Sequence, residues 1–397
     1  MTANRARPLS SVIESPSPRA WIDFAKGTAI ILVVLYHSSL FLSEVDLAGS
    51  TPRLRAFLSF IPMAVFLFIA GLTAARTVTW SFAQLWRRRL SGLIYLYLLW
   101  SALRVIFYLV VPHVRESERA PTDVLTIALV PIWPTSSYWF IWALALFALI
   151  AWLVRRVPVW LQLTLSGLLA VASSTPGLLD TNNVGWDRVF QNLFFFLIAL
   201  YGASQLHQLV EKVRIWHVVV LAVAYVFMAI LLIPFHGARI PGLVLVEGAI
   251  AIALTVSAST LLVRVRWLAF VSALGRASLT IYLIHVFVIA LVVALVAPIS
   301  ASAPLVLLAN FLPIGLAIIA LGASLLLGRF LRRMTWLWVN PFRPRQHRRG
   351  PTPAADSPAA MASPPSALPL VLPDLSASHP TPLIVPESRL PSRTTKE

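Results

Sequence analysis

The residues best suited to chemistry lie in one apolar stretch near the start of the chain. Asp23, Lys26 and His37 interrupt the segment 21–42, which is otherwise largely apolar. An ionisable group in the middle of such a segment costs roughly 3 kcal/mol to place in a membrane, so each one is a functional candidate. An imidazole can accept a proton near neutral pH, and an ammonium can bind an anionic group such as phosphate. Together they suggest proton transfer near an anion-binding site.

Helical spacing would place these three side chains on one face. Lys26 and His37 are eleven residues apart and would differ by only about 20° around a helix, with roughly 16 Å between them along its axis. Asp23 precedes Lys26 by three residues, which makes the two neighbours on the helix surface. The structural alternative is an ion pair at the membrane surface and a histidine hydrogen-bonded within the core. Gly27 would let another helix or a ligand approach closely.

Three consecutive arginines, Arg87, Arg88 and Arg89, stand directly before the apolar segment 90–111. Guanidinium groups bind phosphate oxygens through paired hydrogen bonds, so the run is a candidate phosphate site. Arginines at the cytoplasmic end of a helix also determine membrane topology. Both interpretations are open from the sequence alone.

Polar residues also gather in a late apolar segment. Ser278, Tyr282 and His285 are spaced i, i+4 and i+7 and would share a helix face. We expect them to line a groove that contacts a substrate, although ordinary hydrogen bonding between helices would use the same residues. Glu247 and Arg104 are the other deep charges. Glu247 is grouped with the substrate-contacting residues, and whether it pairs with Arg104 is left open.

Composition indicates what must position these residues. Of 397 residues, 58% are hydrophobic and 12% are charged, whereas a soluble domain has about a quarter charged residues. Most of the surface must therefore face lipid. The chain has no cysteine, which excludes disulfides and thiolate chemistry. A net charge of +17 would suggest nucleic acid in a soluble protein, but here we attribute it to membrane topology and expect no nucleic-acid partner.

Ten stretches approach the roughly 20 apolar residues that a membrane span needs. Because open sheet edges cannot be satisfied in lipid, we expect helices throughout, in an all-α integral membrane protein. The fourth, fifth and sixth stretches are the shortest. The ten are 21–42, 57–75, 90–111, 138–154, 159–175, 189–206, 215–235, 241–263, 277–297 and 304–328.

Basic residues fall mainly in alternate connecting segments, as the positive-inside rule requires. We therefore expect a multi-pass protein of the cell membrane with both termini in the cytoplasm. The first stretch is long enough to span, and no small-residue cleavage site follows it. The predicted domains are a cytoplasmic tail (1–20), a transmembrane domain (21–330) and a basic, then Pro-, Ser- and Ala-rich tail (331–397) that we expect to be disordered.

Several familiar catalytic patterns are missing. The sequence contains no G-x-S-x-G, no H-E-x-x-H and no G-x-x-x-x-G-K-[ST], and it has no histidine cluster of the kind that binds metals. These absences argue against a hydrolase, a metalloprotease or an ATP-driven pump. No metal site is expected.

Four stretches, in order, resemble the membrane acyltransferase-3 family, which includes sugar O-acetyltransferases and glucan succinyltransferases. In the family's first-helix motif, a basic residue precedes the key histidine by eleven, as Lys26 precedes His37. Many members have arginine at that position, and the Pro-Tyr that usually follows the arginine motif is Leu96-Tyr97 here. The similarity spans about residues 20–330. The four stretches are D-F-A-K-G-T-A-I-I-L-V-V-L-Y-H (23–37), F-I-P-M-A-V-F-L-F-I-A-G (60–71), R-R-R-L-S-G-L-I-Y-L-Y-L-L-W-S (87–101) and S-L-T-I-Y-L-I-H (278–285).

The resemblance implies O-acylation of a cell-envelope glycan, glycolipid or similar acceptor. The donor would be cytoplasmic acyl-CoA, in the first instance acetyl-CoA, and no cofactor would be bound permanently. Lys26 and the arginine run would hold the nucleotide. The pantetheine arm, roughly as long as the spacing between Lys26 and His37, would present the thioester near His37.

The resemblance leaves the role of His37 open between general base and transient acyl carrier. Asp23 would complete the catalytic group by positioning Lys26. The main rival interpretation is a transporter or flippase of an envelope precursor, in which the polar stripe lines a path and no bond is made. A second is a scaffold subunit with a purely structural His37. Membrane lipids are expected partners, and the oligomeric state is not predicted.

Overall fold

The computed structural model describes most of the chain up to residue 342, all of it within the unit Met1–Pro344. The described part is helical, with turns and loops between helices and no β-strand. This agrees with the expected all-α class. The N-terminal residues 1–19 and residues 343–397 of the predicted tail lie outside the described residues, whereas the first part of that tail, 331–342, is described and includes the 3₁₀ turn η6 (Thr335–Leu337). The described residues are 20–51, 55, 57, 59–111, 129–134, 137–233, 235, 237–300 and 302–342.

Every predicted span has a helical counterpart among the described residues. Short 3₁₀ turns and one π-helical turn, η2 (Trp86–Leu90), join some of the α-helices. The α-helices are α1 (Ala20–Ser43), α3 (Phe60–Ala74), α4 (Phe82–Leu85), α5 (Ser91–Val110), α7 (Trp139–Leu153), α8 (Val159–Ser174), α9 (Val184–Tyr201), α10 (Ala203–Glu211), α11 (Ile215–Leu232), α12 (Leu243–Leu262), α13 (Ala269–Arg276), α14 (Ser278–Val296), α15 (Ala303–Leu308) and α16 (Leu312–Leu331).

Helix length and composition support a multi-pass membrane protein. Within the described residues, seven helices are long and apolar enough to cross a membrane, or eight if the bent pair α9–α10 counts as one span. The apolar helices α7 and α8 have only 15 and 16 residues, fewer than the roughly 20 that a span needs. The count of ten spans and the cytoplasmic placement of both termini therefore stay predictions.

The last predicted span, 304–328, was wrong in its boundaries. The chain forms two helices there, the short α15 and then α16, which runs on to Leu331. Pro313 stands in the first turn of α16, where its missing N–H costs nothing. Asn310, between the helices, accepts hydrogen bonds from the backbone N–H and the hydroxyl of Ser50 at 2.8 and 2.9 Å. These bonds tie the break to the loop that follows α1.

The sixth predicted span, 189–206, is also shifted. Helix α9 begins earlier, at Val184, and the chain bends by 78° between α9 and α10. Gly202 stands at the bend, where an added Cβ would lie 2.8 Å from the carbonyl oxygen of Ile198. Helix α10 has no buried residue. It therefore continues along the protein surface rather than through the core.

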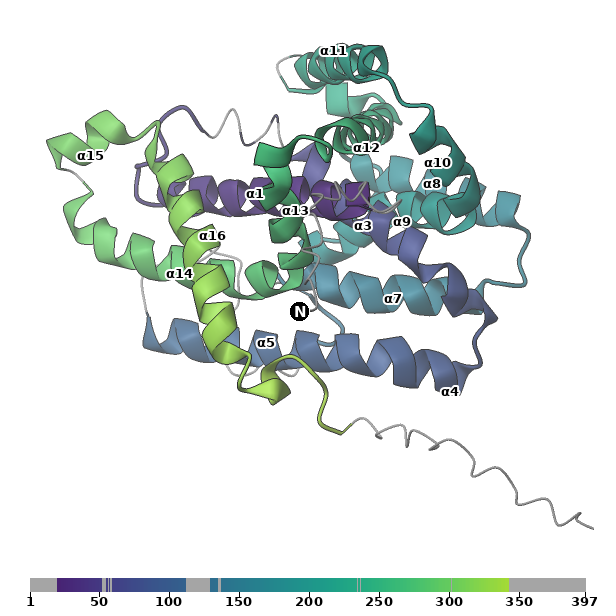
Figure 1. Ribbon diagram of the computed structural model, residues 1–397, viewed down its shortest axis with the longest axis horizontal. Helices are drawn as coiled ribbons and strands as arrows, with labels where there is room; N and C mark the ends of the chain where they lie inside the picture. The colour runs from purple at the N-terminus through teal and green to yellow at the C-terminus, as the bar shows by residue number, and fades with distance from the viewer. Residues whose placement is uncertain are drawn as a thin grey trace, which may run out of the picture. The chain divides into compact units, whose positions relative to one another are not determined.

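Helix α1 lies at the centre of the helix packing. It contacts α3, α12, α13, α14 and α16, and α1, α14 and α5 lie one below another in Figure 1, consistent with their contacts. Large parts of α11 and α16 are instead exposed and apolar. An exposed apolar helix face is what lipid would cover. The stripe carrying Lys26 and His37 is thus on a helix that is packed on several sides by other helices.

The first half of α1 crosses α13 with backbone touching backbone. A Cβ added to Gly27 would lie 1.9 Å from the carbonyl oxygen of Val271, and one added to Gly275 would lie 1.7 Å from that of Asp23. Only glycine allows helices to approach so closely. The expectation that Gly27 permits a close approach is confirmed, and the approaching element is α13.

Candidate active site

Two histidines meet between α1 and α14. Nε2 of His285 lies 3.4 Å from Nδ1 of His37, and the rings are edge-to-face with centroids 5.1 Å apart. His285 is completely buried, whereas His37 is half-buried. From the sequence the two residues were predicted to lie in separate parts of the site, with His285 contacting substrate. The structure brings the two imidazoles into direct contact.

The backbone around each ring suggests how the protons are arranged. Nδ1 of His285 lies 3.0 Å from the carbonyl oxygen of Ile281, and Nδ1 of His37 lies 2.9 Å from that of Val33. A carbonyl oxygen can only accept, so both rings are assigned a proton on Nδ1 in the neutral form. Nε2 of His285 then presents a lone pair to the Nδ1–H of His37. The remaining lone pair of His37 is on its own Nε2, the atom that would take up a proton.

Two crossed tyrosine contacts hold α14 in register with the start of α7. The Tyr138 hydroxyl donates to the carbonyl oxygen of Leu283 at 2.7 Å, and the Tyr282 hydroxyl donates to that of Ser137. Both rings are buried. The hydroxyl of Tyr282, predicted to contact substrate, therefore bonds the backbone and fixes the helix that carries His285. Ser278 stands half-buried at the first residue of α14.

The first turns of α1 form a charged group at the α13 crossing. Nζ of Lys26 lies 2.8 Å from Oδ1 of Asp23, with each side chain about one-third exposed. A pair this exposed contributes little to stability, so Lys26 is available to a ligand. Arg276 follows Gly275 at the crossing and is exposed. Arg276 was not singled out from the sequence as a site residue, and its place directly after Gly275 was the available signal.

The arginine run forms the π-helical turn η2 between α4 and α5. Arg87 and Arg88 are exposed and Arg89 is half-buried, and the Arg88 guanidinium lies 5.4 Å from the centre of the Trp80 ring. A π-helical turn is rare and is often found at functional sites. Turn η2 packs mainly against α4, α5 and α7, and a common site with Lys26 stays a prediction.

Glu247 and Arg104 do not pair. Glu247 is completely buried in α12, and neither of its carboxylate oxygens has a hydrogen-bond partner among the described residues. Arg104 is buried in α5, with its guanidinium 4.9 Å from the centre of the Tyr108 ring. No hydrogen bond or ion pair of the described residues joins Glu247 to the His37–His285 pair, so its predicted contact with substrate stays a prediction.

A pocket opens between α3, α9 and α12. Gly248, the residue after Glu247, is part of its lining. Its polar lining includes Arg188, Gln191 and Asn192, from the first turns of α9. Arg188 donates to the Gln191 side-chain oxygen at 3.1 Å, and Asn192 donates to the Arg188 carbonyl oxygen at 2.8 Å. These residues were not predicted from the sequence. Their i, i+3, i+4 spacing at the start of an apolar helix was the available signal.

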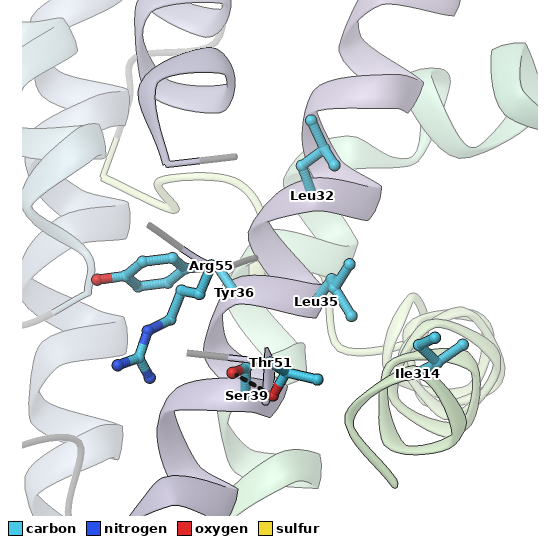
Figure 2. A pocket seen from close by; sticks show the side chains of 7 residues that line it. All are labelled: Leu32, Leu35, Tyr36, Ser39, Thr51, Arg55 and Ile314. Atoms are coloured by element: carbon cyan, nitrogen blue, oxygen red, sulfur yellow. Dashed lines mark hydrogen bonds between the residues drawn. The ribbon is translucent and has the colours of Figure 1, made fainter. Parts of the chain in front are cut away.

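A second small pocket lies along the second half of α1, and Figure 2 shows the side chains that line it. Tyr36 lines it and contacts the His37 ring, with ring centroids 5.4 Å apart. The Arg55 guanidinium lies 5.8 Å from the Tyr36 ring centre, and Ser39 and Thr51 share a hydrogen bond of 3.0 Å. Leu32, Leu35 and Ile314 supply the apolar lining. The pocket thus combines hydroxyls and a cation with an apolar wall.

Comparison with known proteins identifies the family. A family model described as an acyltransferase domain matches residues 19–330, and the chain belongs to the membrane acyltransferase-3 family. No curated protein and no solved structure gave a match. Together with its apolar helices, this membership makes the chain a multi-pass membrane acyltransferase.

Proposed function

We propose that the protein transfers an acyl group, acetyl in the first instance, from cytoplasmic acyl-CoA to a hydroxyl of a cell-envelope glycan, glycolipid or similar acceptor. The observation that carries the proposal is the contact between His285 Nε2 and His37 Nδ1 inside a membrane acyltransferase. Such a contact orients an imidazole, as the third member of a catalytic triad does. The membrane would be the cell membrane.

In this proposal His37 is the general base. Its Nε2 takes the proton of the acceptor hydroxyl while that oxygen attacks the thioester carbonyl carbon. When the C–S bond breaks, the CoA thiolate leaves and receives the proton from His37, so that the products are the ester and free CoA. The imidazolium formed between these steps keeps its Nδ1–H near two acceptors, the Val33 carbonyl oxygen and His285 Nε2. His285 acts through His37 and is a positioning residue.

The alternative role of His37, transient acyl carrier, uses the same atom differently. Nε2 would attack the thioester and form an acyl-imidazole before the acceptor arrives. Incubating the purified protein with labelled acyl-CoA and no acceptor, followed by a rapid quench, separates the two. Label held on the His37 peptide supports the carrier, whereas free CoA released only after acceptor is added supports the base.

The whole proposal is tested by acceptor chemistry. Cell-envelope glycans and glycolipids from cells with and without the protein are compared by mass spectrometry, which detects both the acyl group and the acceptor. We expect a mass difference of one acyl group on a glycan hydroxyl, and purified protein in lipid vesicles should make the same product from acyl-CoA. Identical envelopes, with no transfer by the purified protein to any glycan fraction, would contradict the proposed activity.

The proposed donor site at the charged end of α1 can be tested separately by measuring acyl-CoA binding. Replacing Lys26 or Arg88 by alanine should weaken acyl-CoA binding roughly tenfold or more, because each change removes a charge-assisted hydrogen bond to phosphate. Binding of labelled acyl-CoA to purified protein measures this. Arg264→Ala, which removes an exposed arginine after α12, is the matched control and should bind like wild type. Unchanged affinity in both Lys26→Ala and Arg88→Ala would exclude the predicted phosphate clamp.

The transporter alternative predicts helices broken within the membrane. Among the described residues, one helix pair, α9–α10, could form a bent membrane span, and its second helix has only nine residues, none of them buried, and carries Gln205, His207 and Glu211. Such a polar, surface-lying helix is typical of an interfacial element rather than of half a membrane span. The bend therefore does not favour transport.

A further inference from the structure

A long groove runs along α16 where it faces α13 and α14. It has a volume of about 560 Å³. Its lining positions on α16 repeat with helical spacing, so they form a single stripe along that helix. The wall is apolar over most of its length and basic at one end only. The lining residues are Phe270, Ala273, Leu274, Ala277, Thr280, Ile318, Leu321, Gly322, Leu325, Arg329 and Arg332.

The dimensions of the groove match one leaflet of a bilayer. Ile318 and Arg332 are fourteen residues apart on α16, which corresponds to about 21 Å along the helix. Half of the hydrocarbon core of a membrane is about 15 Å thick, and the headgroup layer lies beyond it. The apolar part, from Ile318 to Leu325, covers about 10 Å of this depth, and Arg329 lies about 16 Å from Ile318 along the helix, near where a headgroup would begin. Both arginines are exposed.

We propose that this groove binds one anionic phospholipid. Arg329 and Arg332 bond its phosphate and the anionic part of its headgroup, while an acyl chain lies against Leu321, Gly322 and Leu325. Basic pockets between membrane helices recognise anionic headgroups in this way. The groove has open space at Gly322, because a Cβ added there would meet no atom within 4 Å. The inference does not depend on the proposed acyl transfer, since it concerns a different surface.

Lipid selectivity tests the arginines. The full-length protein in detergent is mixed with equal amounts of phosphatidylglycerol and phosphatidylcholine of the same acyl chains, and bound lipid is counted by native mass spectrometry. We expect wild type to retain phosphatidylglycerol preferentially. In the double variant Arg329→Gln/Arg332→Gln this preference should fall roughly 25-fold, since each arginine near an anionic headgroup contributes about a fivefold preference. Arg333→Gln, on the same helix end but not lining the groove, should keep it.

A glycine pair tests the groove independently of charge. Gly322→Leu fills the wall of the groove and should reduce retention of both lipids. Gly315→Leu adds the same side chain to the same helix outside the groove, again with no atom within 4 Å of the new Cβ, and should bind lipid as wild type does. The pair keeps the proposal testable even if the double arginine variant does not fold.

Three results would overturn the proposal. One is equal retention of phosphatidylglycerol and phosphatidylcholine by wild type. Another is unchanged lipid binding in Gly322→Leu together with unchanged selectivity in the double arginine variant. The third is loss of phosphatidylglycerol on addition of millimolar inorganic phosphate, because the arginines would then form a site for a small anion and not for a lipid.

Discussion

Replacing His37 by alanine is expected to abolish acyl transfer while the protein still inserts in the membrane and folds. Loss of a general base costs roughly a hundredfold to ten-thousandfold in rate, and loss of an acyl carrier would cost at least as much. His37 is half-buried and is replaced by a smaller apolar side chain, so the change should disturb packing little. Transfer from labelled acyl-CoA to acceptor measures the effect.

The control for this variant is another histidine. His207→Ala changes a residue of the surface helix α10, which has no buried residue, and should keep wild-type activity. Purified His37→Ala that transfers acyl groups as fast as wild type would exclude both proposed roles of His37 and would favour the structural interpretation of the imidazole.

His285 distinguishes a positioning role from a packing role. His285→Leu fills the buried space but cannot accept the hydrogen bond from His37, and it should lower kcat by up to about a hundredfold, as misplacement of a catalytic group does. His285→Gln retains an acceptor near the position of Nε2 and should recover much of that loss. The KM for acyl-CoA should change little in either variant. Equal kcat for the leucine and glutamine variants would mean that the residue only fills space.

The helices were predictable because apolar runs of membrane length leave few alternatives to a helix. Boundaries were less predictable where the run continues through a break. In 304–328 the apolar composition hides the interruption, and Pro313 was a usable signal that α16 begins there. The bond between Asn310 and Ser50, which fixes the break, joins residues that only the tertiary structure brings together.

The site was predictable within a helix but not between helices. Helical period placed Asp23 beside Lys26, and the two form an ion pair. The same period put Tyr282 and His285 near one face of α14, yet it could not say that this face meets α1. Two rings far apart in sequence touch because α1 and α14 pack together, and sequence spacing carries no such information. For the same reason, the sequence could not predict that Glu247 and Arg104 do not pair.

The second prediction with a large expected effect concerns the crossing of α1 and α13. Gly275→Ala should destabilise the protein, even though alanine stabilises a helix by about 1 kcal/mol relative to glycine. The added Cβ would lie 1.7 Å from the Asp23 carbonyl oxygen and 2.9 Å from the Gly27 backbone nitrogen. Neither contact can relax by turning a side chain, so the helices must separate, at a cost of about 1–3 kcal/mol.

Thermal unfolding of the purified variant measures this cost, with Gly322→Ala as the matched control because its new Cβ would meet no atom within 4 Å. Gly275→Ala should unfold at a lower temperature than wild type, and Gly322→Ala at the same temperature or higher. Separation of the helices would also move Asp23 and Lys26, so acyl-CoA binding should weaken in Gly275→Ala alone. If the Gly275→Ala protein were as stable as Gly322→Ala, the backbones of α1 and α13 would not be in contact. Contacts other than this crossing would then have to position Lys26.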